Sequence, residues 1–94
     1  TLALEALRLG GGVPAALNGA NEVAVQAYLD DAFSFPQIAG ILERVMVRLA
    51  AWRVQADAPG CLRHIRTVEE AVAADRYGRQ LAGEELTHIG TAAC

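Results

Sequence analysis

The chain lacks the features that mark membrane and secreted proteins. None of its apolar runs approaches the roughly 20 uncharged residues that a membrane-spanning helix needs, and no signal-peptide pattern opens it. We therefore expect no membrane partner and a cytoplasmic location. The first residue is Thr1 rather than Met, so we expect a processed or excised piece of something longer.

An excess of basic residues is also missing. The net charge is −3 and the pI is near 5.2, whereas proteins that bind a phosphate backbone concentrate Lys and Arg on one face. Arg44, Arg48 and Arg53 fall along one side of a predicted helix, which we interpret as a solvated face. We predict no nucleic-acid partner.

Signals for β-strands are absent, because no long β-branched run alternates with polar residues. The 94 residues are 53% hydrophobic and 20% charged, which suits one small globular domain. This length leaves no room for a nucleotide-binding domain and a catalytic domain together. We predict an all-α fold, a small four-helix bundle-like domain over residues 1–94.

The first two predicted helices meet at a run of three glycines. Residues 2–9 form a short apolar-rich helix with Leu4 and Leu7 on one side. Gly10 to Gly12 should end it, since glycine accepts the left-handed conformation that closes a helix. Their spacing is not that of a phosphate-binding loop. Pro14 suits the first turn of the next helix, which should end near Leu29.

Within that second helix, the stretch LNGANEVAVQAYL over residues 17–29 mixes polar and small apolar residues. Helical spacing places the following residues on or beside one face that we expect to be buried: Leu17, Ala20, Ala24, Val25, Tyr28 and Leu29. Asn18, Asn21 and Glu22 lie on the neighbouring face, and we interpret them as a helix start. Asp30 and Asp31 should lie in the following turn rather than bind a metal.

The third predicted helix has the strongest amphipathic pattern. Ser34 and Gln37 form a capping box, with Pro36 in the first turn. The apolar stripe that should face the core contains Phe35, Ile38, Ile41, Leu42, Val45, Met46, Leu49 and Trp52.

Residues 55–66 contain Pro59 and Gly60 and are predicted to be a linker. Cys61 and His64 form a C-x-x-H pair, and with His88 and Cys94 they could make a tetrahedral zinc site. Structural zinc sites usually have two tight pairs, so we favour two free thiols in a reducing compartment. A Cys61–Cys94 disulfide would require an oxidising one.

Thr67 and Glu70 predict a capping box at the start of the last helix. We expect its buried stripe to be Val68, Ala71, Val72, Ala82 and Leu86. Asp75 and Arg79 are spaced for an ion pair. A sharper hypothesis has Asp75 turn inward to accept hydrogen bonds from the backbone N–H groups of Gly10 to Gly12 or of Asn18. The tail after Leu86 should be frayed.

No catalytic constellation emerges from these residues. The single serine, Ser34, is a helix cap, and the histidines lie in the predicted linker and tail. The residues therefore predict a helical packing or interaction module, with no catalytic, cofactor-binding or metal-ligating residue.

Two segments carry a resemblance to a known family. The stretch LALEALRLGGGVPAALNGANEVAVQAYLDDAFSFPQIAGILERV, residues 2–45, resembles the C-terminal segment of 1-deoxy-D-xylulose 5-phosphate reductoisomerases. In that family a helix ending in a glycine pair leads through a proline into a line close to LNAANEVAV. TVEEAVAADRYGR, residues 67–79, is similar to the closing helix of the family. Residues 46–66 do not resemble its usual short connection, and Gly19 stands where the family often has alanine.

The resemblance implies a role within a larger enzyme. Enzymes of this family rearrange and reduce 1-deoxy-D-xylulose 5-phosphate to 2-C-methyl-D-erythritol 4-phosphate with NADPH and Mg²⁺ or Mn²⁺, usually as homodimers. Their NADPH-binding and catalytic domains precede a C-terminal helical domain. The resemblance thus implies a structural domain that supports the catalytic domain of the same polypeptide, with no cofactor or metal of its own. The alternative is a free-standing helical interaction or zinc-binding module.

Overall fold

The protein is an assembly of helices. A computed structural model describes residues 1–93, and the side-chain surroundings of residues 1–89. The five helices are α1 (Leu2–Leu9), α2 (Val13–Leu29), α3 (Phe35–Trp52), α4 (Gly60–Arg63) and α5 (Val68–Ala93). The described part contains no strand, which confirms the predicted all-α class. Four helices are substantial and α4 is a single turn.

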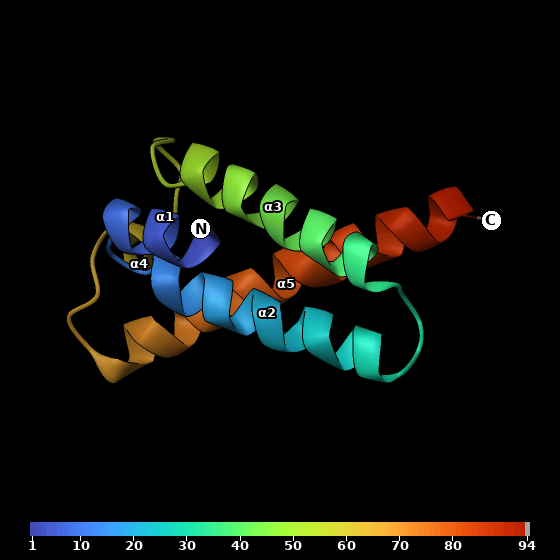
Figure 1. The fold of residues 1–94 in the computed structure, drawn as a ribbon. Coiled ribbons are helices and arrows are strands. Elements are labelled where there is room, and N and C mark those ends of the chain that lie inside the picture. The colour runs from blue at the N-terminus through green and yellow to red at the C-terminus, as the bar shows by residue number, and fades with distance from the viewer. Residues whose placement is uncertain (94) are drawn as a thin grey trace.

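Helices α2 and α5 form the centre of the molecule (Figure 1). They share the most extensive contact of any helix pair, and α3 packs on both. Helix α1 covers α2 and α3 at one end, where α4 also lies against α5 and α2. The result is elongated, 40 Å by 23 Å by 23 Å.

Small residues let α2 and α5 approach closely. A Cβ atom added to Gly78 of α5 would overlap the backbone carbonyl of Ala16 in α2. One added to Gly19 of α2 would lie only 2.5 Å from the carbonyl oxygen of Asp75. The distance between packed helices depends on the side chains at the contact, so these two glycines set the spacing of the central pair.

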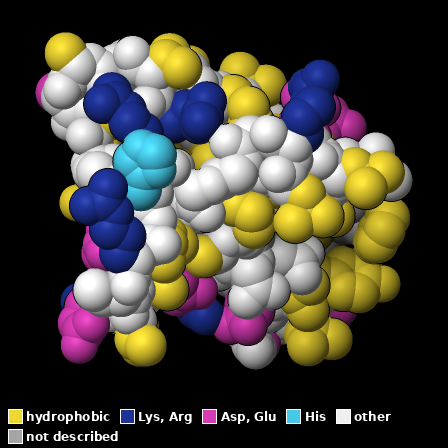
Figure 2. Space-filling view, turned by 90° about the vertical axis from the view of Figure 1, so that its left-hand side faces the viewer, with side chains coloured by type: hydrophobic (Ala, Val, Ile, Leu, Met, Phe, Trp, Pro, Cys, Tyr) yellow, Lys and Arg dark blue, Asp and Glu magenta, His cyan; other side chains and the backbone are white. Residues whose placement is uncertain are grey.

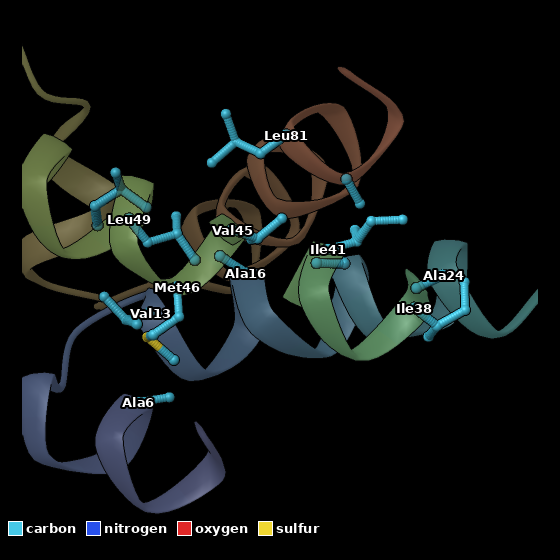
Figure 3. Packing of buried hydrophobic residues seen from close by; sticks show 13 residues of the cluster. Ala6, Val13, Ala16, Ala24, Ile38, Ile41, Val45, Met46, Leu49 and Leu81 are labelled. Atoms are coloured by element: carbon cyan, nitrogen blue, oxygen red, sulfur yellow. The ribbon is translucent and has the colours of Figure 1, made fainter. Parts of the chain in front are cut away.

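The core lies between α2, α3 and α5 (Figure 3). The predicted stripe of α3 is confirmed for five of its residues, which are buried: Ile38, Ile41, Val45, Met46 and Leu49. Leu42 and Trp52 are partly buried and pack against this core. Phe35 is 68% exposed, so its place in the stripe was wrong. It lies at the first turn of α3 and contacts the ring of Tyr28 edge-on, with centroids 6.1 Å apart.

The predicted helix ends agree well with the structure. The backbone N–H of Ser34 donates to Gln37 Oε1 at 2.8 Å, and the N–H of Gln37 donates to Ser34 Oγ at 3.4 Å. The N–H of Glu70 donates to Thr67 Oγ1 at 3.1 Å. Gly10 and Gly11 have φ of 72° and 57°, in the left-handed region that glycine tolerates.

Two predictions for α2 were wrong. The helix begins at Val13 with Gly12 as its N-cap and Pro14 in the first turn, so Asn18, Asn21 and Glu22 lie inside the helix rather than at its start. Ala20 and Ala24 are buried as expected and Leu17 is half-buried. The last members of the expected face are exposed, however: Val25 by 40%, Tyr28 by 45% and Leu29 by 66%. The C-terminal end of α2 runs apart from α5 (Figure 1). Val25, Tyr28 and Leu29 continue the side of α2 that carries the exposed Asn18 and Asn21, at helical spacing from them.

Helices occupy part of the predicted linker and most of the predicted frayed tail. Within residues 55–66, helix α4 buries Cys61 and Leu62. Helix α5 continues to Ala93, and Leu86 and Ile89 pack against the core. Leu86 was the last residue of the expected stripe, and Ile89 is spaced to share its helix face, so Ile89 extends the packed face of α5 beyond the point where we expected it to end.

The expected buried stripe of α5 was wrong at its first turns. Val68 is 75% exposed and Val72 is 44% exposed, and Ala71 is half-buried. Ala82 is buried as expected, and Ala74, Gly78 and Leu81, which the expected stripe did not include, are buried as well. Close packing on α2 favours the face with small residues over the face with valines.

Candidate functional site

The structure describes three of the four candidate zinc ligands, and these three do not gather into a metal site. Cys61 is buried and is a free thiol, while His64 and His88 are exposed. Cys94 lies outside the described residues. Within residues 1–93, no three His, Cys, Asp or Glu side chains gather as potential metal ligands. Asp30 and Asp31 lie at the end of α2 and in the turn after it, as predicted.

Cys61 occupies a packed position at the end of the bundle. A Cβ atom added to Gly12 would overlap the carbonyl oxygen of Cys61. Burial, as the largest cause, raises the pKa of the Cys61 thiol. The thiolate is the reactive form of cysteine, so Cys61 should remain protonated and unreactive at neutral pH.

The glycine turn between α1 and α2 is closed by the segment around α4. The N–H of Gly12 donates to the carbonyl oxygen of Leu62 at 3.1 Å, and the N–H of Gly10 donates to that of Ala6 at 3.0 Å. A Cβ atom on Gly11 would lie 2.5 Å from the Leu62 oxygen. Backbone carbonyls therefore face this turn where a phosphate-binding loop would need free N–H groups.

Asp75 and Arg79 form the predicted ion pair, with Arg79 Nε 2.7 Å from Asp75 Oδ2. Arg79 also pairs with Glu22 of α2, so the guanidinium joins α5 to α2. Hydrogen bonds to Asp75 and then to Glu22 raise the pKa of Arg79. The hypothesis that Asp75 accepts hydrogen bonds from Gly10 to Gly12 or from Asn18 is wrong. Within the described residues its carboxylate accepts from Arg79, and Gly10 and Gly12 donate to backbone carbonyls instead.

A second group of charges joins α3 to α5. Arg48 pairs with Glu84 at 2.7 Å and with Glu85 at 3.1 Å, and Arg44 pairs with Glu85 at 3.1 Å. Hydrogen bonds from Arg48 and then from Gln80 lower the pKa of Glu84. Two of the three arginines that we interpreted as a solvated face are thus paired within the domain. The absence of a nucleic-acid partner stays a prediction.

A groove of about 470 Å³ lies between α1, α2 and α3. None of its lining residues is charged: Leu2, Ala3, Ala6, Leu7, Pro14, Leu17, Asn18, Asn21 and Leu42. Leu7 of this lining is 66% exposed, and Leu4, on the same side of α1, is 64% exposed. Figure 2, which views the end that carries α1 and α4, shows a broad hydrophobic area on its right-hand side.

The sequence identified the apolar side of α1 but not the groove. Leu4 and Leu7 share one side of α1, as their spacing predicts. Their exposure arises because Ala6, on another side, is the α1 residue that enters the core. The polar residues Asn18 and Asn21, misinterpreted as a helix start, line this groove. Only the packing of three helices brings these features together.

No helix in the part of the chain that the structure covers has the length and apolar character to cross a membrane.

Comparison with known proteins points to one family. The family model described as DXP reductoisomerase C-terminal domain matches residues 1–81. This match runs through residues 46–66, which we had separated from the resemblance. No solved structure matches the chain.

The chain is similar to curated proteins that carry the name 1-deoxy-D-xylulose 5-phosphate reductoisomerase. One from Nocardia farcinica is 41% identical over 83 residues, covering 88% of this chain and 19% of the relative. One from Trichlorobacter lovleyi is 38% identical over 93 residues, covering 99% and 21%. One from Pseudomonas aeruginosa is 41% identical over 90 residues, covering 95% and 20%. The chain spans about a fifth of the length of these relatives. On this evidence, the chain belongs to the DXP reductoisomerase C-terminal domain family.

Proposed function

We propose that residues 1–94 are the C-terminal structural domain of a 1-deoxy-D-xylulose 5-phosphate reductoisomerase. Such an enzyme would rearrange and reduce 1-deoxy-D-xylulose 5-phosphate to 2-C-methyl-D-erythritol 4-phosphate with NADPH. The observation that carries the proposal is the family match over residues 1–81, together with about 40% identity to enzymes of that name across most of the chain.

The residues of this domain favour a supporting role over a chemical one. Its charged side chains join helices to each other: Arg79 links α5 to α2, and Arg44 and Arg48 link α3 to α5. The groove offers apolar surface without a titratable group. Groups arranged in this way can hold a domain together and present a packing surface, but they supply no acid, base or nucleophile.

The described residues do not fit NADPH or a divalent metal. Carbonyl oxygens face the glycine turn, and no three potential ligands gather within residues 1–93. We therefore assign the binding of NADPH and of Mg²⁺ or Mn²⁺ to the domains that would precede this one. The partner of this domain would be the catalytic domain of the same polypeptide, within a cytoplasmic homodimer.

The test begins with the intact mass of the polypeptide that contains this segment, isolated from its own cell with an antibody against the segment. We expect a mass far above 9.9 kDa. The isolated polypeptide should oxidise NADPH in the presence of 1-deoxy-D-xylulose 5-phosphate and Mg²⁺, while residues 1–94 alone should not.

Other outcomes would overturn the proposal. Turnover by residues 1–94 alone would show that the domain is itself catalytic. A mass near 9.9 kDa would indicate a separate protein, and bound zinc in it would favour the alternative of a free-standing helical interaction or zinc-binding module.

A further inference from the structure

The groove between α1, α2 and α3 is built as a site for another apolar surface. Leu2, Leu17 and Leu42 form its walls and pack against the core, and the buried Ala6 lies among them. These residues are positioned by the fold, so the groove is preformed. Leu7 extends the apolar surface outward from it, with a side chain that is 66% exposed. Exposed apolar surface of this kind marks interaction sites.

The polar groups of the groove suit a polypeptide rather than an ion. Asn18 and Asn21 are exposed, and their side chains make no hydrogen bond within the described residues. A side-chain amide both donates and accepts, so it can bond the N–H or C=O of a docked backbone. The groove has no charged lining residue, which disfavours a charged ligand.

The path of the chain indicates what fills the groove. Thr1 caps α1 by accepting a hydrogen bond from the N–H of Leu4 at 3.3 Å, and Leu2 is already a wall of the groove. The relatives are about five times as long as the matched region, and the family model describes a C-terminal domain. Polypeptide that precedes Thr1 would therefore arrive at the edge of the groove, where tethering raises its effective concentration.

We infer that this groove docks an uncharged apolar segment of the polypeptide that precedes the domain, with Leu7 as its exposed anchor. The inference rests on the proposed function, because it takes the preceding polypeptide to be the rest of a reductoisomerase. It adds the surface through which the two parts meet. Leu7 and the groove walls are buried by this contact in the full-length protein.

The test is thiol labelling of the full-length protein. Leu7→Cys is compared with Leu29→Cys as a matched control, since both leucine side chains are 66% exposed. Leu29 is the last residue of α2, at the end of that helix away from the groove. The background carries Cys94→Ser. Peptide mapping by mass spectrometry follows each thiol, and labelling in denaturant provides the reference rate. Ala3→Cys, also in the groove lining, adds only one sulfur atom and serves if Leu7→Cys does not fold.

We expect the thiol at position 7 to react on the order of tenfold more slowly than the thiol at position 29, because labelling must await local opening of the contact. This protection should not change on dilution. Equal labelling of the two positions would overturn the inference. Protection that is lost on dilution would also overturn it, since a second copy would then fill the groove. NADPH turnover by the unmodified full-length protein separates the cases: turnover with equal labelling leaves the proposed function intact and removes only the docking surface.

Discussion

At the scale of single residues, Gly78 and Gly83 lie on the same helix, α5, in opposite surroundings. A methyl group on Gly78 would overlap the Ala16 carbonyl, whereas one on Gly83 would meet nothing within 4 Å. We expect Gly78→Ala to lower the free energy of unfolding by about 1–3 kcal/mol, because backbone must move to admit the methyl group. Gly83→Ala should raise it by up to about 1 kcal/mol, since alanine has the higher helix propensity. Urea denaturation measures both; equal effects would contradict the close approach of α2 and α5.

Glu84 provides a test by pH at the same scale. Bonds from Arg48 and Gln80 lower its pKa in the folded protein from the usual value of 4.5. A carboxylate with a depressed folded pKa stabilises the fold above its unfolded pKa, and this contribution is lost as the pH falls through the folded pKa. We therefore expect Glu84→Gln to lower the melting temperature slightly at neutral pH and to have less effect well below pH 4.5. The effect should be small because the pair is exposed.

The control for this experiment is Glu43→Gln. Glu43 is exposed and forms no ion pair within the described residues. Its variant should follow the wild-type melting curve across the same pH range. A Glu84→Gln variant that behaves identically would show that the Arg48–Glu84 pair contributes no stability.

At the scale of helices, the C-terminal part of α5 is the element that differs most from expectation. Ile89 packs against the core while the neighbouring His88 is exposed. We expect Ile89→Ala to destabilise the domain by about 1–2 kcal/mol, less than for a fully buried residue because Ile89 is only partly buried. His88→Ala should be nearly neutral. Thermal unfolding followed by circular dichroism distinguishes the two, and a silent Ile89→Ala would restore the interpretation of a frayed tail.

At the scale of the whole molecule, α4 packs against both central helices, α2 and α5. Leu62 is fully buried, and its carbonyl oxygen accepts from Gly12 at the start of α2. We expect Leu62→Ala to lower the free energy of unfolding by roughly 2–5 kcal/mol. Ile65→Ala, at a position that is 37% exposed, should cost less. Unfolding in urea should remain a single transition.

A Leu62→Ala variant as stable as the wild type would mean that residues 55–66 form a loose linker after all. Retained stability in Ile65→Ala serves as the check that the effect is specific to the buried side chain.

Local chemistry in the sequence was sufficient to predict where most helices begin and end. Capping by Ser34 and Thr67, the left-handed turn at Gly10 and the first-turn Pro14 are interactions among near neighbours along the chain. Such interactions depend little on distant contacts. The stripe of α3 was also predictable, because large apolar residues repeat at helical spacing. The resemblance to the reductoisomerase family likewise rested on short segments of sequence.

Tertiary packing decided which faces are buried and where the groove lies. The apolar pattern of α5 favoured Val68 and Val72, but contact with α2 selected Gly78 and the alanines beside it, because small residues permit closer backbones. Leu62 is buried in a segment without periodicity, since its partners come from the start of α2 and from α5. The groove joins residues of three helices. Its shape depends on how those helices pack against one another, and no local pattern in the sequence predicts that packing.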